Sequence, residues 1–394
     1  MQVASRVQGF TESVIREMTR LCQLHGGINL AQGFPDFPAP EALKEAACRA
    51  VMTDFNQYAI TWGARNLREA IARKASAFNR IPGVDPDRHV TVTCGATEAM
   101  MATMLALVEP GDEVVVFEPF YENYGPDAIL SQARLRFVPL ESGRDGTEFS
   151  FDPDALRAAF GPRTRAIVIN TPHNPTGKVF SRQELADIAQ VCLETGALAI
   201  TDEIYEHMVY EGEHVSIASL PGMADRTITI SGLSKTFAVT GWRLGYVIAP
   251  PEISDAIRRV HDFLTVGAPA PLQEAAVTAL GFGQDYYDDL LAKYRERRET
   301  MRDILVAADL PPMVPQGAYY MLSDISRFGL TDLEMARLLV EEIGVAIVPG
   351  TSFYANKDLG RSLIRFAFPK KPETLAAARE RLAKLPERLP AIAR

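Results

Sequence analysis

From residue 90 onward, the sequence repeats short apolar runs that are followed by turns and by segments with helical periodicity. The runs predict strands at 90–93, 113–117, 135–139, 165–169, 197–201, 227–230 and 246–248. Helices are expected at 98–108 and 181–194, and the second opens with Ser181 and Glu184 in a capping-box pattern. Short apolar strands separated by helices predict an α/β fold with a mostly parallel sheet that helices cover on both faces.

The segments that flank these units differ from them. Helical periodicity is expected at 10–25, 41–52 and 66–78 before the units, and at 252–264, 272–281 and 286–307 after them. Beyond the long charged helix at 286–307, we expect strands at 318–322, 346–349 and 363–367. This pattern predicts a large domain at 46–284. It also predicts a smaller α+β domain, in which the N-terminal segment 1–45 packs with 285–394.

Charge and cysteine content exclude several classes of protein. A net charge of -9 argues against nucleic acid, which favours a basic surface. The four cysteines form no CxxC pair, so they indicate reduced thiols rather than a disulfide framework or a zinc site. The first residues lack a signal-peptide pattern, and no apolar run reaches membrane-spanning length. We therefore expect a cytoplasmic protein that binds neither nucleic acid nor membrane.

One lysine and one arginine stand in an otherwise small or apolar segment, SGLSKTFAVTGWRLGY at 231–246. Apolar neighbours disfavour an ammonium group, so the pKa of Lys235 should fall and a neutral amine should become available for Schiff-base chemistry. Arg243 stays charged and suits a phosphate. From this segment alone, an ordinary exposed lysine on a turn is an equally good interpretation.

Asp202 follows the predicted strand at 197–201, at the end where open α/β sheets bind ligands. An acid beside a pyridine nitrogen keeps that nitrogen protonated. Glu203, the next residue, invites a metal interpretation. No histidine lies at ligand spacing from this pair, and His207 is a weak candidate, so we expect no metal.

Two turns that follow predicted strands are further candidates. Gly95 and Ala96, between a strand and a helix, would let the backbone approach an anion at the helix N-terminus, although many turns of this kind look alike. The segment NTPHNPTG at 170–177 precedes a capped helix, and its simplest interpretation is a turn with two prolines.

Arg365 lies within the apolar strand pattern LIRFAF at 363–368. Burying a guanidinium is costly unless an anion accompanies it, so a carboxylate partner is implied. The partner is either a ligand or an acidic residue of the protein in a structural salt bridge.

Together these segments resemble the class I aminotransferases of fold type I, which use pyridoxal 5'-phosphate (PLP). The matches run in order from Gln32 to Arg365, and QGFPDF at 32–37 and CGATEA at 94–99 are most similar to the kynurenine/methionine/glutamine aminotransferase subgroup. The resemblance implies a large domain with a mostly parallel, seven-stranded-type sheet and a smaller α+β domain.

The resemblance also implies a role for each candidate residue. For catalysis it implies Lys235, Asp202 and Tyr205. Around the cofactor it implies Gly95, Ala96, Thr97, Arg243 and either Ser231 or Ser234 at the phosphate, Tyr121 stacked on the ring, Asp202 at the ring nitrogen, and Asn174 and Tyr205 at the phenolic oxygen. For the substrate carboxylate it implies Arg365, Asn174 and the backbone of Gly33. Tyr58 would reach the cofactor phosphate of a neighbouring subunit, so a homodimer with shared active sites is expected. Cis peptide bonds are expected at 174–175 and 118–119.

The implied activity is the transfer of an amino group from an L-amino acid to a 2-oxo acid, by a ping-pong mechanism through a Lys235 aldimine. One departure concerns the substrate: the chain has TVGA at 265–268, where kynurenine-type enzymes carry bulky aromatic and imidazole side chains. This weakens the case for an aromatic substrate, and both dicarboxylic and neutral donors stay open.

Three other functions are alternatives to transamination. A β-elimination from cysteine conjugates would use the same scaffold and the same proton abstraction. A PLP-binding sensor would normally carry an added DNA-binding domain, for which the N-terminal segment offers one helix and no basic patch. A dinucleotide-binding dehydrogenase fails because no G-x-G-x-x-G motif opens a βαβ unit.

Overall fold

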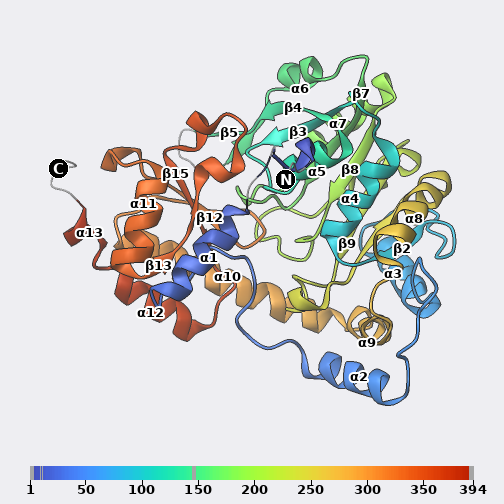
Figure 1. Ribbon diagram of the computed structural model, residues 1–394, viewed down its shortest axis with the longest axis horizontal. Coiled ribbons are helices and arrows are strands. Elements are labelled where there is room, and N and C mark those ends of the chain that lie inside the picture. Colours follow the sequence, from blue (N-terminus) through green and yellow to red (C-terminus); the bar gives the residue numbers. More distant parts are fainter. Residues whose placement is uncertain (1–3, 9, 11, 144–147, 390–394) are drawn as a thin grey trace.

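The computed structural model describes residues 4–8, 10, 12–143 and 148–389, and it contains two main sheets with helices around each (Figure 1). Both extreme ends of the expected small domain, and Thr11 within the expected first helix, lie outside the described residues. Within this part of the chain, no helix is both long enough and apolar enough to cross a membrane.

The larger sheet has seven strands in the order β2-β10-β9-β8-β7-β3-β4. Their bounds are β2 (Val90–Thr93), β3 (Glu113–Glu118), β4 (Arg134–Pro139), β7 (Thr164–Asn170), β8 (Leu198–Asp202), β9 (Thr227–Gly232) and β10 (Gly245–Ile248). β10 is antiparallel to both of its neighbours, and the other neighbouring strands are parallel. The predicted α/β fold with a mostly parallel sheet is confirmed.

Helices cover both faces of this sheet because its central strands are apolar on both sides. Val114 and Val116 of β3 pack in one cluster with residues of α4 (Ala96–Leu107), α5 (Tyr124–Ser131) and α8 (Pro251–Thr265). Val115 and Phe117 point to the other face, because successive side chains of a strand alternate. There they meet α6 (Pro153–Ala159) and α7 (Arg182–Thr195), and a third cluster adds α2 (Glu41–Met52), α3 (Arg65–Ala77) and α9 (Ala270–Leu280).

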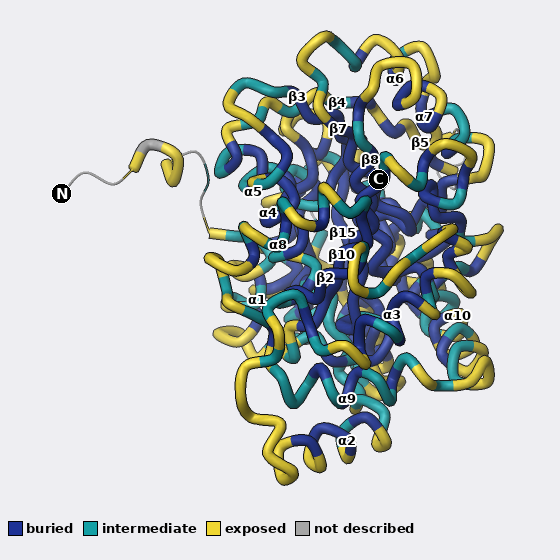
Figure 2. Tube along the Cα trace, turned by 90° about the vertical axis from the view of Figure 1, so that its right-hand side faces the viewer, coloured by how far each residue is buried: buried dark blue, intermediate teal, exposed yellow. Residues whose placement is uncertain are grey.

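The smaller sheet has four strands in the order β11-β12-β15-β14. Its strands and helices are β11 (Pro312–Met313), β12 (Tyr320–Asp324), β14 (Val348–Pro349), β15 (Leu363–Ala367), α11 (Asp332–Leu338), α12 (Pro372–Leu382) and α13 (Leu385–Arg388). The long helix α10 (Gln284–Ala307) joins the two regions: its Tyr286 and Tyr287 pack beside the large sheet, while Tyr294 and Met301 lie in the core of the small one. Figure 2 shows the buried strands at the centre and the exposed outer faces of the helices.

The N-terminal segment packs on the smaller sheet region, as predicted. Met18 and Cys22 of α1 (Val14–Leu24) are buried in the core of that region. Directly after the helix, β1 (Ile28–Asn29) pairs in parallel with β13 (Val345–Ala346). A separate hairpin-like pair joins β5 (Glu141–Ser142) to β6 (Phe149–Ser150).

Some predicted element bounds were wrong for identifiable reasons. The helix expected at 10–25 begins at Val14. The strand expected from 318 begins at Tyr320, because Ala318 has a φ of 58° and lies in the left-handed region. Helix α5 was not predicted because Gly125 and Pro126 suggest a turn; both lie in the first helical turn, where proline is tolerated.

Candidate active site

A cavity of about 520 Å³ opens at the carboxyl ends of the parallel strands. Ten of the residues predicted from the sequence line it: Gly33, Ala96, Thr97, Tyr121, Asn174, Asp202, Tyr205, Ser234, Lys235 and Arg243. Tyr320 of the smaller sheet and the first turn of α1 complete the wall. The cavity therefore lies where an open α/β sheet is expected to bind a ligand.

Lys235 follows the end of β9 and points into this cavity. Its Nζ donates to the carbonyl oxygen of Gly33 at 3.1 Å. Burial and, next, the positive charge of Arg243 lower the pKa of Lys235 to about 8, whereas Asp202 opposes the shift. The predicted fall in the Lys235 pKa is confirmed. The alternative of an ordinary exposed lysine on a turn is wrong.

Asp202, at the end of β8, is buried with its carboxylate toward the cavity. Burial raises its pKa to about 6, while the Tyr124 hydroxyl, which donates to Oδ2 at 2.9 Å, opposes the rise. Asp127, one turn further along α5, lines the same cavity, and no hydrogen-bond partner of its buried Oδ2 lies within the described residues. Burial and then the charge of Asp202 raise the Asp127 pKa to about 8. Asp127 is therefore neutral near pH 7.

The turn before α4 has a backbone conformation at residue 95 that favours glycine. Gly95 has a φ of 85°, and a Cβ atom there would lie 2.6 Å from Nη2 of Arg243. The guanidinium therefore rests against the turn, beside the free N–H groups at the start of the twelve-residue helix. Arg243, Thr97 and Ser234 all line the cavity, and this donor set fits a phosphate group.

Ser231 does not belong to this group. Its hydroxyl is buried and donates to Oε1 of Glu206 at 2.7 Å, away from the cavity. The structure thus separates the two candidate serines, because only Ser234 lines the cavity wall. The prediction that Ser231 contacts the cofactor is not supported by this placement.

In the sequence the pair Asp202 and Glu203 invited a metal interpretation, but in the structure Glu203 lies in a different acidic group, beside Ser231. Glu203, Glu206 and His214 bring ligand atoms within 4.8 Å of one another. The ammonium of Lys74 lies 2.5 Å from Glu206, and Asn79 donates to both carboxylates. Lys74 and the surrounding donors thus supply the positive charge and hydrogen bonds that a metal ion would otherwise provide.

Arg365 is fully buried behind the cavity wall. Its Nη1 donates to Oδ1 of Asn174 at 2.8 Å and its Nη2 to the carbonyl oxygen of Ala31 at 2.8 Å, while Nε has no partner among the described residues. Its guanidinium carbon lies 4.1 Å from the centre of the Tyr320 ring. No acidic side chain of the described chain forms an ion pair with it, so the structural salt bridge that the sequence allowed is wrong. A buried arginine without an acidic partner fits a ligand carboxylate.

The remaining predicted residues lie around these groups. The Tyr205 hydroxyl is 2.9 Å from that of Tyr320, and the Tyr121 ring meets the Tyr124 ring edge-on at 5.8 Å. The peptide bond before Pro175 is cis, which confirms that prediction. The bond before Pro119, where the resemblance implies a cis bond, is also cis, and so is the bond before Pro172. Tyr58 lies away from the cavity, with 89% of its surface exposed.

Sequence reasoning missed several residues of the cavity wall. Tyr124 and Asp127 come from α5, which was not predicted, and Arg16 and Glu122 come from segments without a motif. One signal was present in the sequence: an aspartate inside an otherwise apolar helical face, as in YGPDAILS, predicts a buried carboxyl group.

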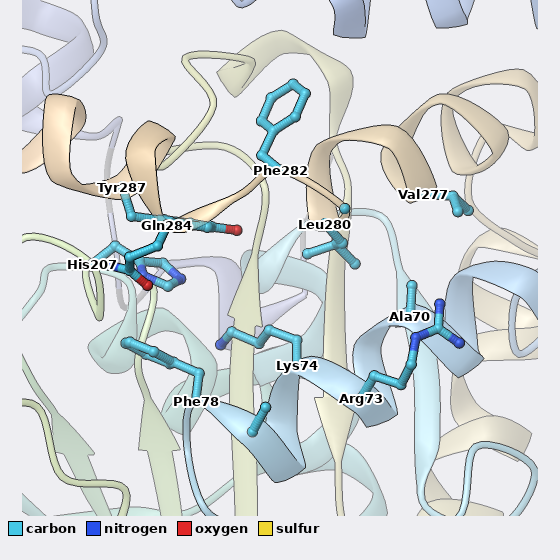
Figure 3. A pocket seen from close by; sticks show the side chains of 12 residues that line it. Ala70, Arg73, Lys74, Phe78, His207, Val277, Leu280, Phe282, Gln284 and Tyr287 are labelled. Carbon is cyan, nitrogen blue, oxygen red and sulfur yellow. The ribbon is translucent and has the colours of Figure 1, made fainter.

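A second cavity, of about 310 Å³, lies between α3 and the junction of α9 and α10 (Figure 3). Figure 3 shows Phe78, His207 and Tyr287 on one side and Arg73 with Val277 on the other. It contains none of the predicted catalytic residues, and its lysine, Lys74, is held by Glu206. The chemistry of the larger cavity therefore identifies that cavity as the candidate active site.

Comparison with known proteins agrees with this geometry. The sequence model of the family described as aminotransferase class I and II matches residues 25–382. The chain is 39% identical to the probable N-succinyldiaminopimelate aminotransferase DapC of Mycobacterium tuberculosis over 98% of both chains. It is 37% identical to kynurenine–oxoglutarate transaminase 1 of Homo sapiens over 97% of both. The solved structure of the N-succinyldiaminopimelate aminotransferase from Mycobacterium tuberculosis superposes with a TM-score of 0.93, at 39% identity, covering 98% of this chain and 100% of that one.

Proposed function

The chain belongs to the class I and II aminotransferases and is a PLP-dependent transaminase, and on this premise we propose that it moves an amino group from an L-amino acid to a 2-oxo acid by a ping-pong mechanism centred on Lys235. The observation that carries this proposal is the position of Lys235. Its amine, with a pKa of about 8, lies in one cavity with Asp202 and Arg243, and Arg365 lies directly behind the wall.

Each group in the cavity suits one part of the cofactor. The Gly95 turn, Thr97, Ser234 and Arg243 would hold the phosphate, and Tyr121 would stack on the ring. Asp202 would pair with the ring nitrogen, while Asn174 and Tyr205 would face the phenolic oxygen. When bound, PLP supplies an aldehyde that condenses with amines and a ring that accepts electrons.

The chain's own residues then perform the proton transfer. Arg365 takes the α-carboxylate of the substrate through its guanidinium, which has a free Nε and which Asn174 already orients. Lys235, as a neutral amine, takes the proton from the substrate α-carbon and later returns it, because its pKa lies close to neutral pH. Asp202, when ionised, holds a proton on the ring nitrogen through an opposite charge.

The test is to mix the purified holoenzyme with single amino acids and no 2-oxo acid. The proposal predicts one equivalent of 2-oxo acid per site and loss of the visible band of the lysine-bound cofactor. Lys235→Ala should abolish this turnover. Steady formation of pyruvate and ammonia from a cysteine conjugate, with the band retained, would instead indicate the β-lyase. A non-catalytic sensor would bind PLP and turn over neither kind of substrate.

We propose further that the enzyme is a homodimer in which Tyr58 completes the partner's active site. Two adjoining segments support this proposal, because several exposed apolar side chains gather on them: Met52, Phe55, Tyr58 and Ile60 on one, and Phe263, Leu264 and Val266 on the other. The segments touch through His261, whose Nε2 lies 2.9 Å from the carbonyl oxygen of Thr61. Large exposed apolar patches commonly mark interfaces.

Hybrid dimers test the shared site directly. Tyr58→Ala and Lys235→Ala subunits, each nearly inactive alone, are mixed under conditions that exchange subunits. If Tyr58 acts across the interface, one site of each hybrid contains both Lys235 and Tyr58, and up to half of the wild-type activity per hybrid returns. If Tyr58 acts within its own subunit, no hybrid site is complete and no activity returns.

We also propose a division of the chain into two domains and a cytoplasmic location. The division into 46–284 and 1–45 with 285–394 is supported by the separate hydrophobic cores around the two sheets, and limited proteolysis of the holoenzyme would test it.

A cytoplasmic location is supported by the four unpaired cysteines, which suit a reducing compartment, and cell fractionation would test it.

A further inference from the structure

After each group of the cavity is matched to the cofactor and to the α-carboxylate, one cation on the wall is left without a role. Arg243 faces the phosphate turn, Lys235 performs the chemistry, and Arg365 stands behind the wall beside Asn174. Arg16 also lines the cavity. No motif marks it in the sequence, and none of the roles above uses it.

The backbone places Arg16 at the rim of the cavity. It lies in the first turn of α1, and Thr19, three residues later on the same helical face, donates to the side chain of Gln32 at 3.3 Å. Gln32 precedes Gly33, whose carbonyl oxygen accepts from Lys235. Helix α1 is thus fixed against the loop that contains Gln32 and Gly33. The first turn of this helix faces the cavity.

The start of α1 is also held from the opposite side. Ser13, directly before the helix, donates to a carboxylate oxygen of Glu122, which lies in the segment between β3 and α5. Both residues line the cavity together with Ile15 and Arg16. The rim thus bridges the N-terminal segment and the large sheet, and Arg16 is part of this bridge.

Arg16 brings a positive charge to this rim. Within the described residues its guanidinium forms no ion pair and no side-chain hydrogen bond. By contrast Arg20, one turn later, pairs with Glu12 at 3.2 Å and does not line the cavity. An arginine with five free donors at a cavity mouth is suited to grip a carboxylate through two parallel hydrogen bonds.

We propose that Arg16 is a specificity-determining residue that binds the side-chain carboxylate of dicarboxylic substrates. This inference rests on the proposed function, in which Arg365 fixes the α-carboxylate. The wall that Arg16 shares also offers the apolar side chains of Ile15, Phe34 and Met100. This lining suits the methylene groups of a short side chain that ends in a carboxylate, as in glutamate and 2-oxoglutarate.

The test compares glutamate with glutamine, which has the same shape and no side-chain charge. Single-turnover rates of cofactor conversion are measured for wild type, Arg16→Gln, Arg16→Lys and the matched control Arg20→Gln. In Arg16→Gln, kcat/KM should fall at least about tenfold for glutamate and by less than about threefold for glutamine. Arg16→Lys should restore part of the loss, and Arg20→Gln should change neither value.

Binding of unreactive acids gives a second readout that does not depend on turnover. Glutarate should bind the wild-type holoenzyme at least about tenfold more tightly than butyrate, and this preference should vanish in Arg16→Gln. An unchanged glutamate-to-glutamine ratio in Arg16→Gln, an equal effect of Arg20→Gln, or a wild-type enzyme without preference for glutarate would overturn the inference. In each of these cases the proposed function would stand as long as the enzyme still converts glutamine. If the wild-type enzyme converts no amino acid at all, the proposed function itself is overturned.

Discussion

The hydroxyl of Tyr124 donates to Oδ2 of Asp202 at 2.9 Å, so a side chain of α5 stabilises the carboxylate at the end of β8. Burial is the main cause that raises the pKa of Asp202 to about 6, and it does so although this hydrogen bond opposes the rise. Removal of the hydrogen bond should therefore raise the pKa further, and a higher pH should then be needed to ionise Asp202.

We expect Tyr124→Phe to lower kcat about fivefold at pH 7, the equivalent of roughly 1 kcal/mol for one hydrogen bond. The acid limb of the pH–rate profile should move to higher pH. The control is Tyr210→Phe, which removes a buried hydroxyl that donates to the carbonyl oxygen of Ala318 outside the cavity. A profile that keeps its acid limb in Tyr124→Phe would show that this hydrogen bond does not control Asp202.

The pKa of Lys235 predicts how cofactor capture depends on pH. Only the neutral amine attacks an aldehyde, and its fraction rises with pH until the pKa is passed. The rate at which the apoprotein takes up PLP should therefore increase up to about pH 8 and then level off. A lysine with its ordinary pKa would keep gaining rate to beyond pH 10.

Asp202 raises the pKa of Lys235, so Asp202→Asn should move the same uptake curve to lower pH. Stopped-flow absorbance on the apoprotein measures both curves. Lys235→Ala, which has no amine at this position, provides the baseline. A shift to higher pH in Asp202→Asn would contradict the assigned electrostatic coupling.

The two serines of the lysine segment should respond differently to the same substitution. Ser234→Ala should raise the dissociation constant of PLP about tenfold, because a hydrogen bond to a charged phosphate is lost. Ser231→Ala should leave that constant within about twofold and lower the melting temperature instead, because Glu206 loses a buried donor. Equilibrium titration of PLP and thermal unfolding of each variant measure these effects. The reverse pattern would show that Ser231, and not Ser234, contacts the phosphate.

Asp127 should make the apoprotein less stable as the pH rises. Its folded pKa of about 8 lies above its ordinary value near 3.9, so the folded state resists ionisation throughout this interval. The contribution of Asp127 to the free energy of unfolding is therefore largest below about pH 4 and is lost progressively as the pH rises to 8.

Asp127→Asn removes the ionisation and should raise the free energy of unfolding at pH 9 by about 1–3 kcal/mol, with little change at pH 4. Thermal or chemical unfolding at both pH values tests this. The control Asp303→Asn alters an exposed acid that pairs with Arg302 and should give no gain at pH 9. Equal stability of wild type and Asp127→Asn at pH 9 would mean that Asp127 is not buried as an acid.

The sequence could predict those parts of the site that follow from the ends of strands. Asp202 and Lys235 each follow an apolar run, and parallel strands bring such positions to one edge of the sheet. The choice between Ser231 and Ser234 could not be predicted, because it depends on which hydroxyl faces Glu206, a contact across 25 residues of sequence. Arg16 was missed for the same reason: tertiary packing, not a local motif, brings it to the cavity.

The pairing of β1 with β13 has a consequence for the order in which the site can be built. Ile28 aligns with Val345, so the loop that carries Gly33 has no strand to lie against until most of the chain has been synthesised. The large sheet, whose strands end at Ile248, can form while the ribosome still holds the rest. The lysine is therefore in place early, whereas the wall that covers it closes only when about the last eighth of the chain emerges. A chain that stops before Val345 would leave Lys235 uncovered.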